Sequence, residues 1–341
     1  MKIIRSSTLV IFITALAFGQ FNDTPQVVSK VATTAGNWLK LGADVRAMAM
    51  GGAGVASGRG VSAIPSNPAA IAYLNNSQVY FSKVNYFAGI SQLVFAGGAK
   101  LGRSDFLAFN LFFLGSGDIE RTTEDQPNGT GSFYNTASLS LRTSYAKRLT
   151  DRLKVGISLN YINDRLDDVR MNTFTFDIGS NFSTGIYGFV LGMAISNFGP
   201  EITYYGSGLD TDVSLVEDAS GQLKKVTRSF PLPLSFRLGV ANELIGPNSI
   251  FIKDPTHRVS MTFEGINPLD YLVSGNMGME YSWREIAFIR AGSFISHDTG
   301  RLSAGAGYRY RADMFIIAVD YAFVNYGILE STQHFSIGID F

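Results

Sequence analysis

A glycine-rich stretch, Gly51–Ala70, holds the residues whose spacing most resembles a chemical site. Its pattern Gly52-x-Gly54-x-x-x-Gly58 is close to the turn that lets a backbone approach a pyrophosphate. Such a turn requires a strand before it, a helix after it and an acidic residue about twenty positions later. Here a helix-like segment precedes the glycines, and Pro65 and Pro68 interrupt the residues after them. We therefore expect no nucleotide site, and instead a segment whose small residues pack closely against another surface.

The remaining polar residues show no pattern that is typical of a catalytic site. The three histidines, His257, His297 and His334, belong to different segments, so the sequence does not indicate a three-histidine zinc site. The run Ser296-His297-Asp298 is adjacent only in sequence, whereas triads are assembled in space. The chain has no cysteine, which excludes disulfides, thiolate metal sites and a cysteine nucleophile. We predict no catalytic residue, no metal site and no cofactor, with a barrel hydrolase as a minor alternative.

Two groups of carboxylates could in principle bind Ca²⁺ weakly. One consists of Asp164, Asp167 and Asp168, and the other of Asp210, Asp212, Glu217 and Asp218. Neither group has the spacing of an EF-hand loop, so we expect solvated surface charges.

The composition is unusual for a soluble enzyme. Basic and acidic residues are equal in number, 28 each, so we expect no general attraction to nucleic acid. Charged residues make up 16% of the chain, against about 25% in typical soluble domains. The 36 glycines, 26 phenylalanines and 15 tyrosines fit a chain much of whose surface faces something other than water.

The N-terminus predicts export. Lys2 and Arg5 precede an apolar run at 9–17, and small residues come after it around 18–20. This is the pattern of a cleavable signal peptide over residues 1–20. The apolar run is about half as long as the ~20 residues that a spanning helix needs.

The segments after residue 76 alternate between apolar and polar residues, which predicts strands with two different faces. In 153–161, for example, Leu153, Val155 and Ile157 oppose Lys154 and Gly156. We predict about fourteen such strands: 77–87, 90–100, 104–114, 132–147, 153–164, 170–182, 186–197, 232–244, 257–266, 272–282, 286–296, 301–310, 313–324 and 333–341.

A soluble sandwich and a transmembrane barrel could both use such strands. The signal peptide, the strand lengths, aromatic residues near strand ends and an even strand number favour an antiparallel barrel in outer-membrane lipid. Short connections alternate with longer ones near 115–131 and 198–231, as periplasmic turns alternate with external loops. The last strand presents Phe335, Ile337, Ile339 and Phe341 on one face, which resembles the signal read by the barrel-assembly machinery.

Residues 21–75 do not alternate, and we predict that they form a hatch, or plug, inside a barrel of residues 76–341. A short helix is expected within 37–50. Gly51, Gly52, Asn67, Pro68 and Ala69 are the candidate hatch motif, in which Asn67 is extended before proline and bonds to neighbouring backbone. Inward-facing charges of both signs predict structural networks that support the hatch: Arg142, Lys154, Asp177, Arg237, Glu264, Glu280, Arg309, Asp320 and Asp340.

The loop around Thr123–Gly129 is the best candidate for a partner surface. Its acidic pair Glu124-Asp125 and the turn-forming run Pro127-Asn128-Gly129 predict an exposed, structured external loop. The full candidate set is Thr123, Glu124, Asp125, Gln126, Pro127, Asn128 and Gly129.

The run "LKLGADVRAMAMGGAGVASGRGVSAIPSNPAAIA" resembles the N-terminal signature of the PorV/PorQ family, within the wider group of FadL-like barrels. Further segments, such as "FTFDIG", "ISNFGPEI" and "FPLPLSFRLGVA", are similar to PorV-type members in order and spacing. The acidic residue usual before the Asn-Pro-Ala is missing, because Arg59-Gly60 stand there.

This resemblance implies a fourteen-stranded barrel with an N-terminal hatch in the outer membrane of a Gram-negative bacterium. It also implies an accessory of type IX secretion that engages the translocon and receives the C-terminal signal domain of cargo. FadL-type members instead pass hydrophobic molecules through the lumen, which is the alternative function, and a structural or orphan paralogue comes third.

Overall fold

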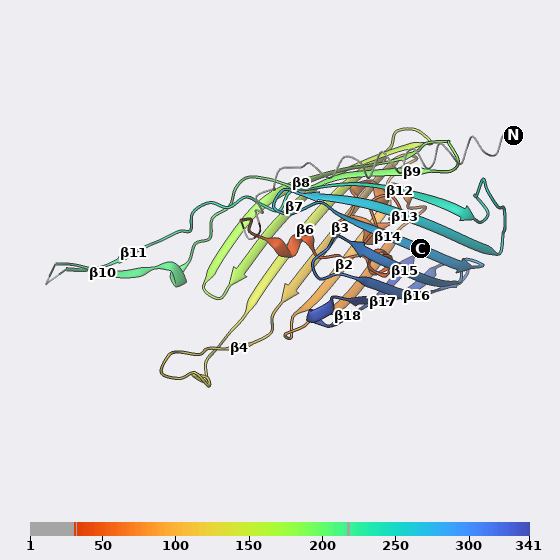
Figure 1. The fold of residues 1–341 in the computed structure, drawn as a ribbon. Helices are drawn as coiled ribbons and strands as arrows, with labels where there is room; N and C mark the ends of the chain where they lie inside the picture. The colour runs from red at the N-terminus through yellow and green to blue at the C-terminus, as the bar shows by residue number, and fades with distance from the viewer. Residues whose placement is uncertain (1–30, 32, 217–218) are drawn as a thin grey trace, which may run out of the picture.

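The computed structural model describes residue 31, residues 33–216 and residues 219–341. The expected signal peptide and the first part of the expected hatch lie outside these residues. In the described part of the chain, fourteen antiparallel strands close into a barrel (Figure 1). All fourteen strand predictions are confirmed to within a few residues.

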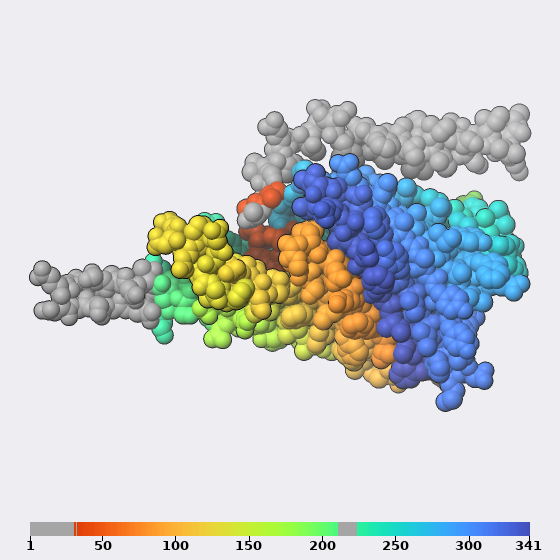
Figure 2. All heavy atoms as spheres, turned by 90° about the horizontal axis from the view of Figure 1, so that it is seen from below, coloured from red at the N-terminus to blue at the C-terminus, as the bar shows by residue number. Residues whose placement is uncertain are grey.

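The barrel strands succeed one another around the wall almost in chain order. They are β1 (Gln78–Asn85), β2 (Ser91–Lys100), β3 (Asp105–Gly115), β6 (Thr136–Arg148), β7 (Leu153–Leu166), β8 (Val169–Ser183), β9 (Val190–Phe198), β12 (Ser235–Ile245), β13 (His257–Pro268), β14 (Ser274–Trp283), β15 (Ala287–Ile295), β16 (Leu302–Arg311), β17 (Ile316–Asn325) and β18 (Ser331–Asp340). Closure occurs between β18 and β1, which pair antiparallel, with Phe81 opposite Ile337. Figure 2 shows this seam as the dark blue last strand beside the orange first strands.

The wall has the reverse polarity of a soluble protein, because its apolar side chains face outward. On β15 the side chain of Ile289 is 66% exposed, whereas the next residue, Arg290, is 3% exposed. On β18, Phe335 is exposed while His334 and Ser336 are buried. This alternation is that of a barrel in lipid with a polar interior. Among the described residues, none of the helices has the length and hydropathy of a membrane-crossing helix.

The two ends of the barrel differ in the length of their connections. At one end, here called the turn end, strands are joined by short links such as 101–104, 149–152, 284–286 and 312–315. At the other, the loop end, the long connections 116–135 and 199–234 leave the barrel (Figure 1). The sequence predicts these two as loops, but each contains a two-stranded hairpin: β4 (Ile119–Glu120) with β5 (Phe133–Tyr134), and β10 (Thr211–Val216) with β11 (Ala219–Leu223).

Residues 33–77 precede β1 and pack against the inner wall; we call them the hatch segment. They contain the 3-10 helices η1 (Asn37–Lys40), η2 (Val61–Ala63) and η3 (Pro68–Tyr73), and the α-helix α2 (Val45–Ala49). The short helix expected within 37–50 is α2, but helix does not run through that whole range, since extended residues separate η1 from α2. The break has a local cause, because the Asp44 side chain accepts a hydrogen bond from the Arg46 backbone N–H and so starts a new helix. Two further 3-10 turns, η4 (Ser207–Leu209) and η5 (Gly327–Leu329), lie in loops.

Candidate functional site

Glycines on the hatch segment and on the wall meet each other directly. Gly51 has φ +69°, and a Cβ there would lie 2.7 Å from the carbonyl oxygen of Ser293 on β15. On the wall side, a Cβ at Gly292 would lie 2.1 Å from the Gly51 nitrogen, and one at Gly278 would lie 2.4 Å from Met50 Cβ. The absence of side chains at these positions lets the hatch backbone lie against the strands.

The same close fit recurs on the other side of the lumen. A Cβ at Gly192 of β9 would lie 2.3 Å from the Val55 carbonyl oxygen, and one at Gly156 of β7 would lie 2.5 Å from Pro68. The wall glycines are thus part of the site, although the sequence shows only that they share the polar face of their strands.

Asn67 joins three parts of the interior. Its Oδ1 accepts a hydrogen bond from the Ala69 N–H at 3.0 Å, which caps η3, and its Nδ2 donates to the carbonyl oxygens of Val55 (2.8 Å) and Ser180 (3.0 Å). The side chain is fully buried. Pro68 comes next at the first position of η3, where its missing N–H has no helical partner to lose.

The side chain of Glu264 on β13 binds the backbone of the glycine-rich stretch. One carboxylate oxygen accepts from the N–H groups of Gly54 (2.8 Å) and Val55 (2.9 Å), while the other pairs with Arg237 at 3.1 Å. The glycines therefore do present backbone donors to an anion, but the anion is a side chain of the wall.

Glu280 of β14 is the centre of a second, larger cluster. It is fully buried and pairs with three arginines: Arg46 of the hatch segment at 2.8 Å, Arg258 at 2.9 Å and Arg290 at 2.6 Å. Removing a buried charge from such a cluster leaves its partners uncompensated, so the cluster ties α2 firmly to the wall.

The other inward charges that the sequence identifies also have specific partners. Arg142 pairs with Asp177 at 2.8 Å, and Arg290 pairs with Asp320 at 2.6 Å. Asp340 accepts from Gln78, and Arg309 lies 3.8 Å from Glu285. Lys154 instead lies over the Tyr73 ring, 4.4 Å from its centroid.

An apolar cavity of about 370 Å³ opens at the loop end, between the hatch segment and the wall. Leu41, Met48, Ile90, Leu114 and Phe294 contribute to its lining. Its lining carries few charged groups, so it suits a small hydrophobic molecule better than an ion.

A second tie fastens the hatch segment at the loop end. Asp270, in the link between β13 and β14, is buried and accepts from Thr34 Oγ1 at 2.7 Å and from Lys40 Nζ at 2.5 Å. Burial opposes the charge of this carboxyl, but the hydrogen bonds from Lys40 and Thr34 outweigh it and hold the pKa of Asp270 below its ordinary value of 3.8.

The predicted partner loop projects from the loop end on the β4–β5 hairpin (Figure 1). Residues 123–128 are exposed and Gly129 is half-buried, and the backbones of Thr123 and Gln126 bond to each other at 3.2 and 3.3 Å. An ion pair between Arg121 and Asp167 ties the hairpin to the neighbouring β7–β8 link. The loop is thus exposed and structured, as the sequence predicts; that it contacts a partner stays a prediction.

The expectation of solvated carboxylates is wrong for Asp164. It is buried at the loop end, where it accepts from Ser138 Oγ at 2.6 Å and from Tyr204 Oη at 2.8 Å. The reason is that β7 continues to Leu166 and turns this side chain into the lumen. Asp167 pairs with Arg121, while Glu217 and Asp218 lie outside the described residues.

The histidines lie in separate places, on β13, in the 296–301 link and on β18. His257 contacts Tyr281, His297 accepts from the Gly300 N–H, and His334 is buried beside Thr332. On the last strand Phe335, Ile337 and Phe341 face outward, and Phe341 exchanges backbone hydrogen bonds with Ser77. Recognition of this strand, including Ile339, by the assembly machinery stays a prediction.

Sequence reasoning missed the pairing of Arg46 with Glu280 and the role of Gln78. Gln78 accepts from the Val61 N–H at 2.8 Å and donates to Asp340 at 2.6 Å, so it joins the hatch segment to the closing strand. The alternation along the strands shows that Glu280 and Gln78 face inward. It does not identify their partners, which lie more than a hundred residues away or in a segment without a repeat.

Comparison with known proteins gives a match to one protein family and a likeness in fold to several solved structures. Residues 24–216, more than half of the 341, match the family described as type IX secretion system protein PorV. No match was found among curated proteins.

Solved structures of similar fold include two toluene transporters, TbuX from Ralstonia pickettii and TodX from Pseudomonas putida. TbuX is 15% identical, with 87% of this chain and 96% of that chain covered and a TM-score of 0.55. TodX is 15% identical, with coverage of 87% and 97% and a TM-score of 0.56. The CymD monoaromatic hydrocarbon channel is 14% identical, with coverage of 87% and 96% and a TM-score of 0.54. At these identities the likeness shows a shared barrel fold and no more.

Proposed function

Because the chain belongs to the family of the type IX secretion system protein PorV, we propose that it is an outer-membrane accessory of type IX secretion. In this role it binds the translocon and the C-terminal signal domain of secreted cargo, and it reaches the outer membrane after cleavage of its signal peptide. Family and fold are those of a transport barrel and not of an enzyme class.

The projecting hairpin around residues 123–129 is the observation that supports this function best. Long loops of outer-membrane barrels face the outside, so the loop end is the external face. A hairpin that is exposed, ordered by its own hydrogen bonds and fastened by Arg121 offers a preorganised surface to a protein partner.

The lumen is poorly suited to passing a polypeptide. The hatch segment crosses it and is fixed at Glu280, Glu264 and Asp270 by buried ionic or hydrogen-bonded contacts. Cargo is therefore held at the loop end and does not thread through this barrel, and the hatch segment supports the wall on which the loops stand.

Deletion of residues 123–130 tests this proposal. We expect the variant to fold into a heat-resistant barrel but to lose co-purification with translocon and cargo proteins. The double charge reversal Glu124→Lys, Asp125→Lys is a milder version, and Asp151→Lys, at an exposed position of the turn end, is its control. Undiminished co-purification of the deletion variant would exclude the loop as the partner surface.

The apolar loop-end cavity favours a second candidate function, a channel for small hydrophobic molecules. The toluene transporters share this fold, and the cavity has a size and lining suited to a ligand of that class. In this case Leu41→Arg would abolish binding of toluene to the purified barrel, whereas Ile328→Arg, at an exposed site of the same end, would not. Secretion of cargo would be unchanged in both variants.

A further inference from the structure

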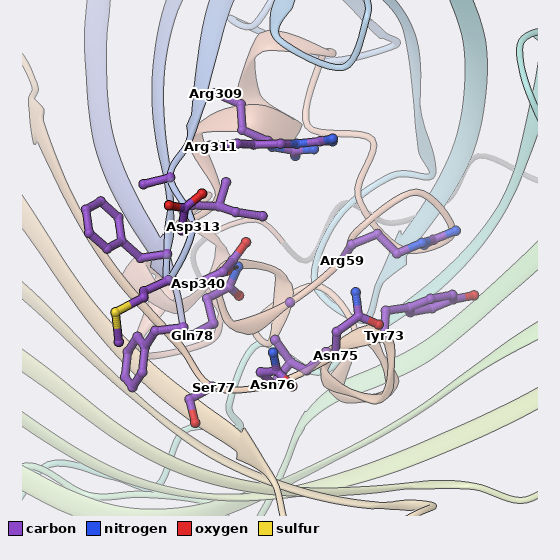
Figure 3. A pocket seen from close by; sticks show the side chains of 17 residues that line it. Arg59, Tyr73, Asn75, Asn76, Ser77, Gln78, Arg309, Arg311, Asp313 and Asp340 are labelled. Atoms are coloured by element: carbon purple, nitrogen blue, oxygen red, sulfur yellow. Dashed lines mark hydrogen bonds between the residues drawn. The ribbon is translucent and has the colours of Figure 1, made fainter. Parts of the chain in front are cut away.

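The turn end holds a cavity of about 530 Å³ that the proposed function does not use. Figure 3 shows Arg59 and Tyr73 on one side of this cavity and Arg309 and Arg311 on another. We call it the turn-end cavity. It lies between the hatch segment, the start of β1 and the β16–β17 link.

Basic residues outnumber acidic ones in the lining of the turn-end cavity, with three arginines (Arg59, Arg309 and Arg311) against two aspartates. Within residues 33–216 and 219–341, no ion pair includes Arg59, Arg311 or Lys154. The guanidinium of Arg59 lies 3.8 Å from the centroid of the Tyr73 ring, and Lys154 lies 4.4 Å from the same ring. The two acidic residues in the lining are Asp313 and Asp340, and Asp340 accepts a hydrogen bond from the neutral amide of Gln78 at 2.6 Å.

The position of Arg59 is fixed by the backbone. Its Nη1 donates to the carbonyl oxygens of Ala56 at 2.8 Å and Gly58 at 2.7 Å, while its side chain stays exposed to the cavity. The next residue, Gly60, has φ +82°, a conformation that favours glycine. Arg59 thus presents to the cavity a cation that is held in place by the backbone.

An apolar groove on the outer wall adjoins this cavity. The groove, about 330 Å³ in volume, is lined by Val79, Leu107 and Phe109 with the small residues Gly97 and Ala99 between them. Ser77, Gln78 and Phe341 line both the groove and the turn-end cavity. The Ser77–Phe341 backbone pair, bonded at 3.0 Å in both directions, is therefore the rim between a cationic space and a lipid-facing groove.

We propose that this rim binds one anionic phospholipid of the leaflet at the turn end. The phosphate-bearing headgroup reaches over Ser77 to Arg59 and Arg311, and one acyl chain lies in the groove beside Ala99. Guanidinium groups bind phosphate through paired, charge-assisted hydrogen bonds, and the groove removes apolar surface of the chain from water. The cationic cavity and the apolar groove match the headgroup and the acyl chain of an amphiphile. A free phosphate compound has no chain and would leave the groove unused.

Native mass spectrometry of the delipidated barrel tests the proposal with three probes: phosphatidylglycerol, phosphatidylcholine of the same chains, and glycerol phosphate. We expect one phosphatidylglycerol to be retained. Phosphatidylcholine keeps the phosphate but carries a quaternary ammonium that the arginines repel, and glycerol phosphate lacks the chain, so each should bind at least about tenfold more weakly.

Two variants separate headgroup from chain. Arg59→Gln is expected to weaken phosphatidylglycerol binding about tenfold, whereas Arg103→Gln, which removes the same charge from an exposed link at the same end, leaves it unchanged. Ala99→Leu fills the groove and is expected to weaken the lipid but not glycerol phosphate, while Ala304→Leu, on the outer face of β16, is its control. Arg311→Gln replaces Arg59→Gln if that variant does not fold.

Equal binding of phosphatidylglycerol by wild type, Arg59→Gln and Arg311→Gln would overturn the proposal. So would equal affinity for the two lipids. Loss of binding in Arg59→Gln together with unchanged lipid binding in Ala99→Leu would also overturn it, because the site would then recognise a soluble phosphate compound.

Discussion

Arg46 of the hatch segment and Glu280 of β14 form a two-point ion pair inside the barrel. Nε lies 2.8 Å from Oε2 and Nη2 lies 3.0 Å from Oε1. This parallel geometry is the strongest that a guanidinium and a carboxylate can adopt. Because Arg46 also donates to the Ser57 carbonyl oxygen at 2.9 Å, the pair fixes both α2 and the glycine stretch relative to the wall.

Glu280→Gln is therefore expected to destabilise the barrel strongly. The substitution leaves Arg46, Arg258 and Arg290 around a neutral amide, and breaking a buried ion pair in this way costs about 3–5 kcal/mol. Urea unfolding of the barrel in detergent or lipid measures the effect. Asp167→Asn, which breaks the exposed pair with Arg121, is the control and should cost less than about 1 kcal/mol. Similar losses in the two variants would contradict the structural role of the cluster.

Asn67→Ala should lower the heat resistance of the folded barrel. The change removes the cap of η3 and two buried hydrogen bonds to the Val55 and Ser180 carbonyl oxygens, so a loss of about 1–3 kcal/mol is expected. The unfolding temperature, read from the gel shift of folded and unfolded barrel, gives the answer. Asn76→Ala, at an exposed position, should leave it unaltered, and an unaltered value for Asn67→Ala would speak against the hatch motif.

Gly292→Val should displace the hatch segment while leaving the wall intact. A Cβ at Gly292 falls 2.1 Å from the Gly51 backbone nitrogen, which is not a flexible side chain and must move. We expect trypsin to cleave after Arg46 or Arg59 in this variant but not in wild type. Gly338→Val is the matched control, because the nearest atom to its Cβ is 3.8 Å away. Protection of both variants would show that the contact is not close in solution.

The tie between Lys40 and Asp270 predicts a dependence on pH. The pKa of Asp270 is lower in the folded protein than its ordinary value of 3.8, so the stabilisation is complete above that value and is lost as the pH falls through the lowered pKa. Hydrogen exchange of residues 34–40 should therefore accelerate only below about pH 4. In Asp270→Asn exchange should be fast at neutral pH and show no such step. A step centred near pH 6 would assign the change to another group.

The sequence predicts the strands of the barrel wall well because apolar and polar residues alternate along each strand and so indicate its two faces. On β7, for example, polar or small residues alternate with the apolar Leu153, Val155 and Ile157, and this alternation indicates that the apolar side chains face lipid. The same pattern recurs through all fourteen strands. The hatch segment has no such repeat. The break between η1 and α2 depends on the single cap at Asp44, which hydrophobic periodicity does not reveal.

Long-range partners are the part that the sequence does not determine. Glu280 and Arg46 are 234 positions apart, and the parity of β14 shows only that Glu280 faces inward. The sequence predicts a solvated Asp164 because the alternation ends at that residue, whereas β7 carries it into the lumen to Ser138 and Tyr204. In both cases the barrel closure, and not the local sequence, selects the partner.

The central claim, a role in type IX secretion, is tested most directly by the proteins released into the medium. We expect that the medium of a strain lacking this chain lacks the cargo proteins, and that wild type, but not the variant lacking residues 123–130, restores them to the medium. A deletion strain whose medium contains the full set of cargo proteins would contradict the account.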